Sequence, residues 1–528
     1  MGIFANPLTD LLEYEDFSRD FLKGTDPVGM TGCIDSEKVH FMSTFLGEKK
    51  VQLVVTYSEQ RAREIEEDYK LFCSQVYVIP PRDLIFFSAD LQGNAIIAER
   101  MKAFAALYQN EAKVIITTMD ALMSAAVPFE QLMSHVIKLK EGDELDLEKL
   151  KHDLTVMGYE RVGRVEEPGQ FTVHGGIADV YPLTMEVPVR IELWGDEIDT
   201  IRCFEPQSQR SMDQIESVSV FPAAEVIADD TARRRAVGMI QNELESQLAV
   251  FKKAKEPDKA KRLREETNRI LEALGEEVVL EAPDSYISYF YPRTVQLSEY
   301  FDEKNTLVFL DEPMRLKERG DGVQAEFEES MKNRLEQGFL LPGQTALLTP
   351  AKHVLAAFER GQVAALSSLD SRLADFTVVN SYAVNVQNMN TYREGFELLI
   401  KDLTHWKKEK YRIVLLCPSR TRANRIVNQL IEYDLLAYYS EDEDKKINPG
   451  EIMVTYGNLH RGFLYPMLKF AVITESDIFG VKKKKKEKKS RYQGQRISDF
   501  AQLKPGDYVV HENYGLGIYR GTERQIVD

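Results

Sequence analysis

Short apolar runs separated by charged, amphipathic segments constrain the fold of this chain more than any other feature of its sequence. The runs at 49–57, 76–80 and 112–118 have the length and β-branched content of buried strands. Segments 58–72 and 96–107 between them have the apolar spacing of amphipathic helices. Strands that alternate with helices in this way predict a parallel α/β sheet.

A β-rich block interrupts this pattern. Residues 159–223 contain short alternating runs and glycine turns, which predict a small antiparallel insert. Residues 231–274 have apolar positions three and four apart, and Pro257 divides them, so we expect a helical hairpin. The α/β pattern then resumes with an apolar strand at 305–313.

A second α/β unit is expected from 376 to 480. Residues 411–419 read as a buried strand, 420–433 as a helix and 469–480 as a late strand. The sequence of this unit predicts its fold but does not indicate its function.

The sequence pattern changes twice in the C-terminal part of the chain. Residues 482–496 hold nine Lys/Arg and one Glu without apolar periodicity, which predicts a solvated, disordered linker, with nonspecific attraction to nucleic acid as the alternative. Residues 503–521 alternate apolar and polar positions and contain a Gly-x-Gly, which we read as a turn in an all-β module. Two strands are marginal alone, so we expect the chain to hold only the start of this module.

Composition limits the classes of function. The chain has 85 acidic and 67 Lys/Arg residues and a net charge of −18, which argues against a DNA-coating role. No apolar run reaches the length of a membrane span and no signal peptide is apparent, so we expect a cytoplasmic protein without membrane association. The eight histidines lack metal-ligand spacing. The cysteines are far apart, which predicts free thiols and no zinc site: Cys33, Cys73, Cys203 and Cys417.

The stretch GMTGCIDS (29–36) is similar to a phosphate-binding loop of the form G-x-x-x-x-G-K-[ST]. Gly29, Thr31 and Gly32 sit in suggestive places and Ser36 stands at the Ser/Thr position, but Ile34 and Asp35 stand where glycine and lysine belong. A carboxylate beside phosphate oxygens costs several kcal/mol in a low dielectric. The loop therefore predicts a degenerate nucleotide site.

The predicted strand at 305–313 ends in two acids. Asp311 and Glu312 have the pattern of a strand-end Mg²⁺-holding acid, a weak signal by itself because acids often follow buried strands. Without a working loop we expect this site to be inactive. No other catalytic or metal-binding motif is present, so we predict no catalytic residue and no metal site.

The hairpin at 188–204 is the strongest candidate for a binding surface. A strand period of two puts Arg190 and Trp194 on the face opposite the aliphatic one, and His174 lies on a neighbouring predicted strand. Arginine and tryptophan are enriched at interface hot spots. The alternative is that Trp194 caps a second small core.

These stretches resemble a known family. Residues 169–182 (GQFTVHGGIADVYP) with 188–211 (PVRIELWGDEIDTIRCFEPQSQRS) strongly resemble the second-domain signature that UvrB shares with the bacterial transcription-repair coupling factors (Mfd). The stretch LKPGDYVVHENYGLGIYRG (503–521) is similar to the start of the RNA-polymerase-interacting, CarD-like domain of that family. The order of these modules is specific to the coupling factors, and the resemblance covers nearly the whole chain.

The resemblance implies a UvrB-like module that has lost nucleotide binding and recruits UvrA, and a domain that grips the β subunit of stalled RNA polymerase. A C-terminal motor outside this chain would use ATP and Mg²⁺ to move on DNA and displace the polymerase. For this chain it implies no cofactor and no catalysis, with DNA contacts mainly in the motor.

Carried over position by position, the UvrA-contacting residues are His174, Arg190 and Trp194. Arg190 matches the family arginine and Trp194 stands at a usual aromatic position. His174 replaces a usual arginine, and a neutral imidazole cannot form a bidentate charged pair.

The expected architecture is multidomain α/β. It has a degenerate helicase-like parallel sheet, an inserted small antiparallel α+β domain, a further small α/β domain and the start of an all-β module. The expected domains are 1–136 (UvrB-like domain 1a), 137–224 (domain 2, UvrA-binding), 225–375 (domain 1b with the helical hairpin), 376–480 (domain 3), 481–497 (basic linker) and 498–528 (start of the polymerase-interacting domain).

Two alternatives remain open. The chain could be a UvrB-like, ATP-dependent, damage-verifying helicase subunit, although the loop lysine is missing and only the short segment 80–94 stands where UvrB has its long aromatic hairpin. It could also be a regulatory scaffold that only contacts polymerase.

Overall fold

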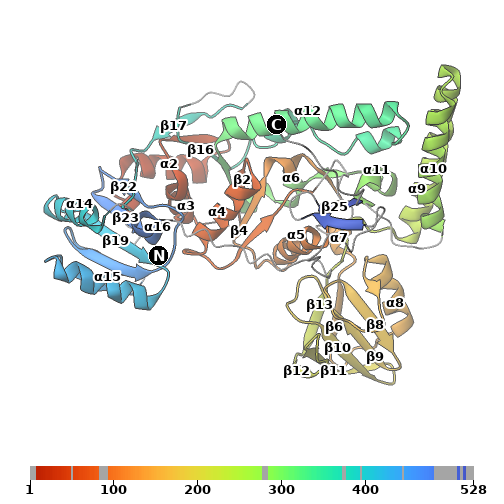
Figure 1. Ribbon diagram of the computed structural model, residues 1–528, viewed down its shortest axis with the longest axis horizontal. Coiled ribbons are helices and arrows are strands. Elements are labelled where there is room, and N and C mark those ends of the chain that lie inside the picture. Colours follow the sequence, from red (N-terminus) through yellow and green to blue (C-terminus); the bar gives the residue numbers. More distant parts are fainter. Residues whose placement is uncertain are drawn as a thin grey trace, which may run out of the picture. The chain divides into compact units, whose positions relative to one another are not determined.

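The computed structural model describes residues 7–48, 51–82, 93–275, 283–370, 376–392, 395–442, 445–480, 508–511 and 515–518. The chain forms two compact units, Met1–Gly480 and Val481–Asp528. Figure 1 shows the mixed α/β architecture of the first unit. The predicted multidomain α/β fold class is confirmed.

The first unit is built around a parallel sheet of seven described strands. Alternate residues of its strands face two different cores: Leu53 and Val55 belong to one, and Val54 belongs to the other. Both faces are therefore buried, which explains why these strands read as continuous apolar runs. In sheet order, the strands are β17 (Asn380–Ala383), β1 (Val28–Thr31), β16 (Val363–Ser367), β15 (Thr306–Asp311), β2 (Val51–Thr56), β4 (Val114–Thr118) and β3 (Val76–Ile79).

Helices contribute the apolar side chains that cover this sheet. Figure 1 shows the long helix α12 running along it. The helices of this lobe are α2 (Leu12–Lys23), α3 (Asp35–Ser43), α4 (Glu59–Tyr69), α5 (Gly93–Tyr108), α6 (Met119–Met123), α7 (Phe129–Met133), α11 (Ile287–Phe290), α12 (Pro313–Glu336) and α13 (Ala351–Ala356). A two-residue antiparallel pair joins β5 (Ala125–Ala126) to β14 (Val295–Gln296).

The β-rich insert is confirmed and is mostly antiparallel. The exception is its short edge strand β7, which pairs with β8 in parallel. The strands, in sheet order, are β12 (Ser211–Gln214), β11 (Glu197–Phe204), β10 (Val189–Trp194), β9 (Ile177–Val180), β8 (Gln170–His174) and β7 (Glu160–Arg161). One face packs against α8 (Leu147–Val156). A separate antiparallel pair joins β6 (Ile137–Lys140) to β13 (Ser217–Val220).

The predicted helical hairpin is also confirmed. Helices α9 (Asp230–Ala254) and α10 (Pro257–Gly275) are separated by Lys255, whose φ of 58° ends the first helix, and Pro257 begins the second. Proline fits that position because the first helical residue needs no amide hydrogen bond. The hairpin stands out from the sheet in Figure 1.

Of the predicted second α/β unit, 376–480, β17 belongs to the seven-stranded sheet of the first lobe. The second lobe, 387–480, is a mixed sheet flanked by helices. Its strands, in sheet order, are β18 (Gln387–Asn388), β22 (Phe463–Tyr465), β23 (Phe470–Thr474), β19 (Arg412–Cys417), β21 (Ile452–Tyr456) and β20 (Ala437–Tyr439). Its helices are α14 (Phe396–Lys408), α15 (Arg420–Glu432) and α16 (Glu475–Phe479).

The prediction of one strand over 469–480 is wrong in its second half. The Thr474 hydroxyl accepts a hydrogen bond from the Asp477 amide and the Asp477 carboxylate accepts one from the Thr474 amide. This reciprocal cap begins α16 immediately after β23.

In the second unit the structure describes two strands, β24 (Tyr508–His511) and β25 (Gly515–Ile518), which pair antiparallel. The predicted Gly-x-Gly turn is wrong, because Gly515 and Gly517 lie inside β25. The predicted linker at 482–496 lies outside the described residues, as does most of segment 80–94.

No helix within the described ranges combines the length and apolar character needed to cross a membrane. All four cysteines are free thiols, and burial raises the pKa of Cys33, Cys203 and Cys417.

Candidate functional site

The structure brings the three predicted contact residues to one face of the inserted sheet. In the strand register His174 lies opposite Ile177, and Ile177 lies opposite Glu192 on the next strand. Arg190 and Trp194 flank Glu192 at two-residue intervals on β10 and so share its face. We call these five residues the open face. The opposite face carries the domain core with α8.

Trp194 stands out from this face. The residue is 85% exposed, at the end of β10 where Gly195 turns the hairpin with a φ of 67°. The alternative that Trp194 caps a second small core is wrong. That small core exists, but Val165, Tyr181 and Phe204 form it.

Arg190 is held in place by its neighbours. Its Nε and Nη2 each donate to the Asp179 carboxylate at 2.8 Å, and its guanidinium lies 4.7 Å from the centre of the Phe204 ring. The hydrogen bonds to Asp179 raise the pKa of Arg190 above its already high value. A fixed guanidinium loses less side-chain entropy when a partner binds it. Its remaining N–H donors can serve a partner.

Residues 29–36, which we call the relic phosphate loop, have the predicted strand–loop–helix frame. Their two glycines, however, serve the packing of the fold. Gly29 lies inside β1, where it pairs with Ala365 and Ser381. Gly32 has a φ of 83°, and a Cβ there would lie 2.0 Å from the carbonyl oxygen of Val384. Close backbone packing therefore requires glycine at position 32, without any need for a phosphate.

Helix α3 begins at Asp35, so this carboxylate occupies the helix N-terminus where an anion would bind. Glu37 adds a second acid there, because its Oε2 accepts the Ile34 amide at 3.1 Å. Ser36 is fully buried. The amide and dipole that would attract phosphate are already satisfied by the protein's own acids.

The two strand-end acids, Asp311 and Glu312, are both bound by side chains of the protein itself. Lys38 donates its ammonium to Asp311 Oδ1 and to Glu312 Oε1, both at 2.6 Å, and Thr56 donates its hydroxyl to Asp311 Oδ2 at 2.8 Å. Arg61 Nε lies 3.4 Å from the same Oδ2. Burial alone would raise the pKa of Asp311, but Lys38 and Arg61 outweigh it and lower that pKa.

ATP with Mg²⁺ does not fit this arrangement. The acids that would hold the metal are bound to Lys38, and a carboxylate stands at the lysine position. Within the described part of the chain, no cluster of three His, Cys, Asp or Glu side chains could hold a metal ion.

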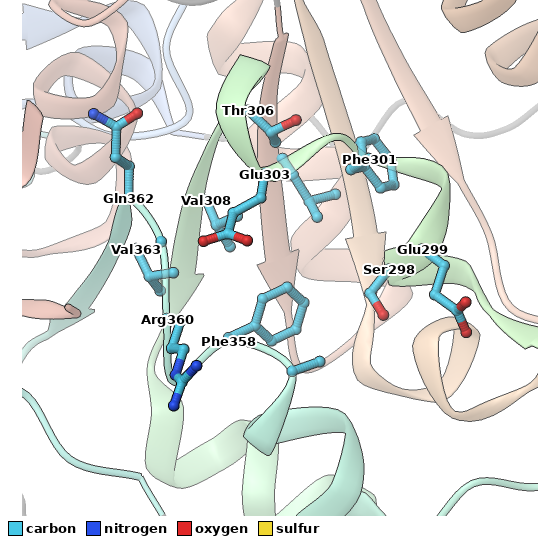
Figure 2. Close-up of a pocket in the computed structure, with 13 residues that line it drawn as sticks. Ser298, Glu299, Phe301, Glu303, Thr306, Val308, Phe358, Arg360, Gln362 and Val363 are labelled. Carbon is cyan, nitrogen blue, oxygen red and sulfur yellow. The ribbon is translucent and has the colours of Figure 1, made fainter. Parts of the chain in front are cut away.

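A pocket lies elsewhere, where strands β15 and β16 begin. Glu303, Phe358 and Arg360 line it together with Thr306 and Val363 (Figure 2). Asp311 and Glu312 lie at the opposite, carboxyl end of β15, so this pocket is separate from the relic nucleotide site.

Sequence reasoning missed three residues that organise these sites: Lys38, Arg61 and Asp179. A signal existed for Lys38, which lies one helical turn after Asp35 on α3. Asp179 could be found from the antiparallel register, which places it opposite Arg190. Nothing local pointed from Arg61 to Asp311, which lies 250 positions away.

Three family models match parts of the chain. The model described as UvrB interaction domain matches residues 137–225, the one described as MFD, D3 domain matches 405–478, and the one described as CarD-like/TRCF RID domain matches 503–528. The first of these matches contains the open face.

Curated relatives match almost the whole chain. The transcription-repair-coupling factor of Bacillus subtilis (strain 168) is 29% identical over 98% of this chain and 44% of its own length. Those of Staphylococcus epidermidis (strain ATCC 12228) and Staphylococcus haemolyticus (strain JCSC1435) are 28% and 29% identical over 99% and 96% of the chain. The chain spans less than half of the length of these relatives, 43–44%.

Proposed function

We propose that this chain corresponds to the N-terminal portion of the bacterial transcription-repair coupling factors and is a non-catalytic recruitment module. It binds the excision-repair protein UvrA and so brings UvrA to RNA polymerase that has stalled at a DNA lesion. In the intact protein, a motor beyond this chain displaces the polymerase by ATP-driven movement on DNA.

The observation that carries this proposal is the open face. It lies in the segment that matches the UvrB interaction domain, and it exposes 85% of a tryptophan beside an arginine that Asp179 holds in place. A few residues carry most of the binding energy at protein interfaces, and tryptophan, tyrosine and arginine are enriched among them. A large exposed aromatic on a rigid strand is therefore suited to a protein partner.

The polymerase contact is assigned to the C-terminal module. Residues 503–528 match the CarD-like/TRCF RID domain, and β24 and β25 form an antiparallel hairpin within it. We assign the β subunit of RNA polymerase as its partner. The part of this module within 498–528 is expected to bind polymerase weakly by itself.

The buried ion pairs of Lys38 with Asp311 and Glu312 disfavour the alternative of an ATP-dependent helicase subunit. Lys38 occupies both Asp311 and Glu312, so a nucleotide would have to displace a buried ammonium from two carboxylates. A scaffold that contacts only polymerase leaves the exposure of Trp194 without a purpose.

Calorimetric titration of UvrA with the chain tests the proposal. We expect Arg190→Ala and Trp194→Ala each to weaken binding by at least tenfold, in line with roughly 2 kcal/mol or more for interface hot spots. Lys149→Ala is the matched control, because Lys149 is exposed on α8, which packs on the opposite face of the sheet. Unchanged affinity in both open-face variants would overturn the assignment.

A further inference from the structure

The relic phosphate loop contacts a specific segment of the second lobe. Residues 457–465 run from the end of β21 through β22 and lie against the N-terminal turn of α3 and the C-terminal end of α4. Two of the contacts are made by Asp35 and Ser36, which stand at the lysine and Ser/Thr positions of the loop.

Backbone amides of this segment donate directly to first-lobe side chains. The Arg461 amide donates to Ser36 Oγ at 2.9 Å, and the His460 amide donates to Asp68 Oδ1 at 2.5 Å. Ser36 and Asp68 are both fully buried. A buried serine or carboxylate without such a donor would be destabilising, so the two surfaces are matched to each other.

Charge complementarity reinforces the match. Arg461 Nη1 lies 3.4 Å from the carboxylate of Asp35, the residue at the lysine position of the relic loop. The Asp35 side chain is 44% exposed and that of Arg461 is 59% exposed, so this pair is solvent-screened. Its role is to select the partner surface, because a lysine at position 35 would repel Arg461.

Buried hydrogen-bonded, aromatic and apolar contacts join α3 to the same segment. The Tyr465 hydroxyl donates to Glu37 Oε1 at 2.6 Å, and the His40 ring stacks on Phe463 with ring centres 5.1 Å apart. Leu459 and Phe463 share one apolar core with Val39 of α3.

A contact within the second lobe fixes the conformation of residues 457–465. The Asp477 carboxylate accepts the Gly462 amide at 2.9 Å. A Cβ at Gly462 would lie 2.4 Å from that carboxylate. The segment therefore meets the relic loop in a fixed conformation.

We propose that the relic phosphate loop is an intramolecular docking seat, in which Asp35, Ser36 and Glu37 hold residues 457–465 and keep the two lobes joined without a nucleotide. The loop has exchanged a phosphate ligand for a peptide ligand from its own chain. The two lobes then behave as one rigid body, whatever the ATP concentration. This inference does not depend on UvrA binding.

Hydrogen exchange of the full chain, followed by mass spectrometry, tests the seat. In Asp35→Arg/Ser36→Ala, we expect the amides of 457–465 to exchange roughly tenfold faster, because a hydrogen bond and a favourable charge are lost. Strand β23 should keep its protection. Asp120→Ala is the control: it removes the surface pair of Asp120 with Arg319 in the same lobe and should leave 457–465 unchanged.

Two further arms make the result decisive. The charge exchange Asp35→Arg/Arg461→Asp should recover most of the protection that Asp35→Arg alone loses. Tyr465→Phe is a conservative change that remains a usable test if the first variant folds poorly. It should raise the hydrogen-exchange rate of 457–465 by a smaller factor. Unchanged protection in these variants would overturn the proposal. So would a change in wild-type exchange at 457–465 on addition of millimolar ATP with Mg²⁺, because a nucleotide would then be entering the seat.

Discussion

At the scale of single residues, Lys38 explains why the strand-end acids remain in this lobe. Asp311 is 1% exposed and Lys38 is 3% exposed, so each charge is buried and depends on the other. Burial lowers the pKa of Lys38, but the adjacent Asp311 and Glu312 carboxylates outweigh it and raise that pKa. The cluster is an internal structural ion pair.

Removing Lys38 alone should therefore be costly. Lys38→Met leaves Asp311 and Glu312 without their ammonium, and we expect a loss of about 3 kcal/mol in the free energy of unfolding. Urea denaturation measures it. The triple variant Lys38→Met/Asp311→Asn/Glu312→Gln should recover most of the loss, because it also removes the buried charges. A loss below about 1 kcal/mol in the single variant would contradict the buried pairing.

Asp179 should act on UvrA binding through Arg190. Asp179→Asn removes a carboxylate that accepts two hydrogen bonds from Arg190, so the guanidinium becomes free to move. We expect UvrA affinity to fall by about threefold to tenfold, less than for Arg190→Ala. Titration calorimetry measures it, and Asp179→Glu should restore part of the affinity. An Asp179→Asn chain that binds as tightly as wild type would show that Arg190 needs no support.

At the scale of elements, local patterns predicted what local physics determines. The apolar runs of β2 and β4, the helical hairpin and one of the glycine turns predicted within 159–223, which lies at Gly195, follow from periodicity, proline and glycine, and all are confirmed. The α16 cap was missed because its signal is one threonine and one aspartate after a strand. The pair of Lys38 with Asp311 was missed because 273 positions separate them in sequence.

Whether a predicted surface is open is likewise a long-range property. Periodicity placed Trp194 opposite the aliphatic face but left open whether another element covers it. The small core of Val165, Tyr181 and Phe204 forms beside Arg190 and leaves Trp194 exposed.

The contact between α3 and β22 should depend on pH. Burial raises the pKa of Glu37 to about 7, against the Tyr465 and Ile34 hydrogen bonds that lower it. Its usual value is 4.5. Between these values the folded chain keeps a proton that the unfolded chain releases, so this group's contribution to stability falls as pH rises from about 4.5 to 7.

Glu37→Gln isolates this contribution. The variant should match wild type in urea near pH 5 and exceed it by about 1–3 kcal/mol near pH 8, because glutamine does not ionise. Other titrating groups are shared by the two chains and cancel in the difference. A difference between variant and wild type that does not change with pH would contradict the assignment.

At the scale of the whole molecule, we propose that the first unit serves recruitment and that ATP is used elsewhere in the intact protein. We expect a fluorescent ATP analogue to show no saturable binding to the chain at micromolar concentrations, because Asp35, Glu37 and Lys38 occupy the positions of phosphate and metal. Fluorescence anisotropy measures it. Micromolar binding that Asp311→Ala abolishes would contradict the prediction and favour the helicase alternative.

The central claim is that the open face recruits UvrA as the corresponding domain of UvrB does. The most direct measurement is competition: labelled UvrB is bound to UvrA and the chain is added in increasing amounts. The account predicts that wild-type chain displaces UvrB completely and that Trp194→Ala does so only at concentrations at least tenfold higher, the affinity loss expected of a hot-spot residue. A stable complex of UvrA with both proteins, or equal displacement by wild type and Trp194→Ala, would contradict it.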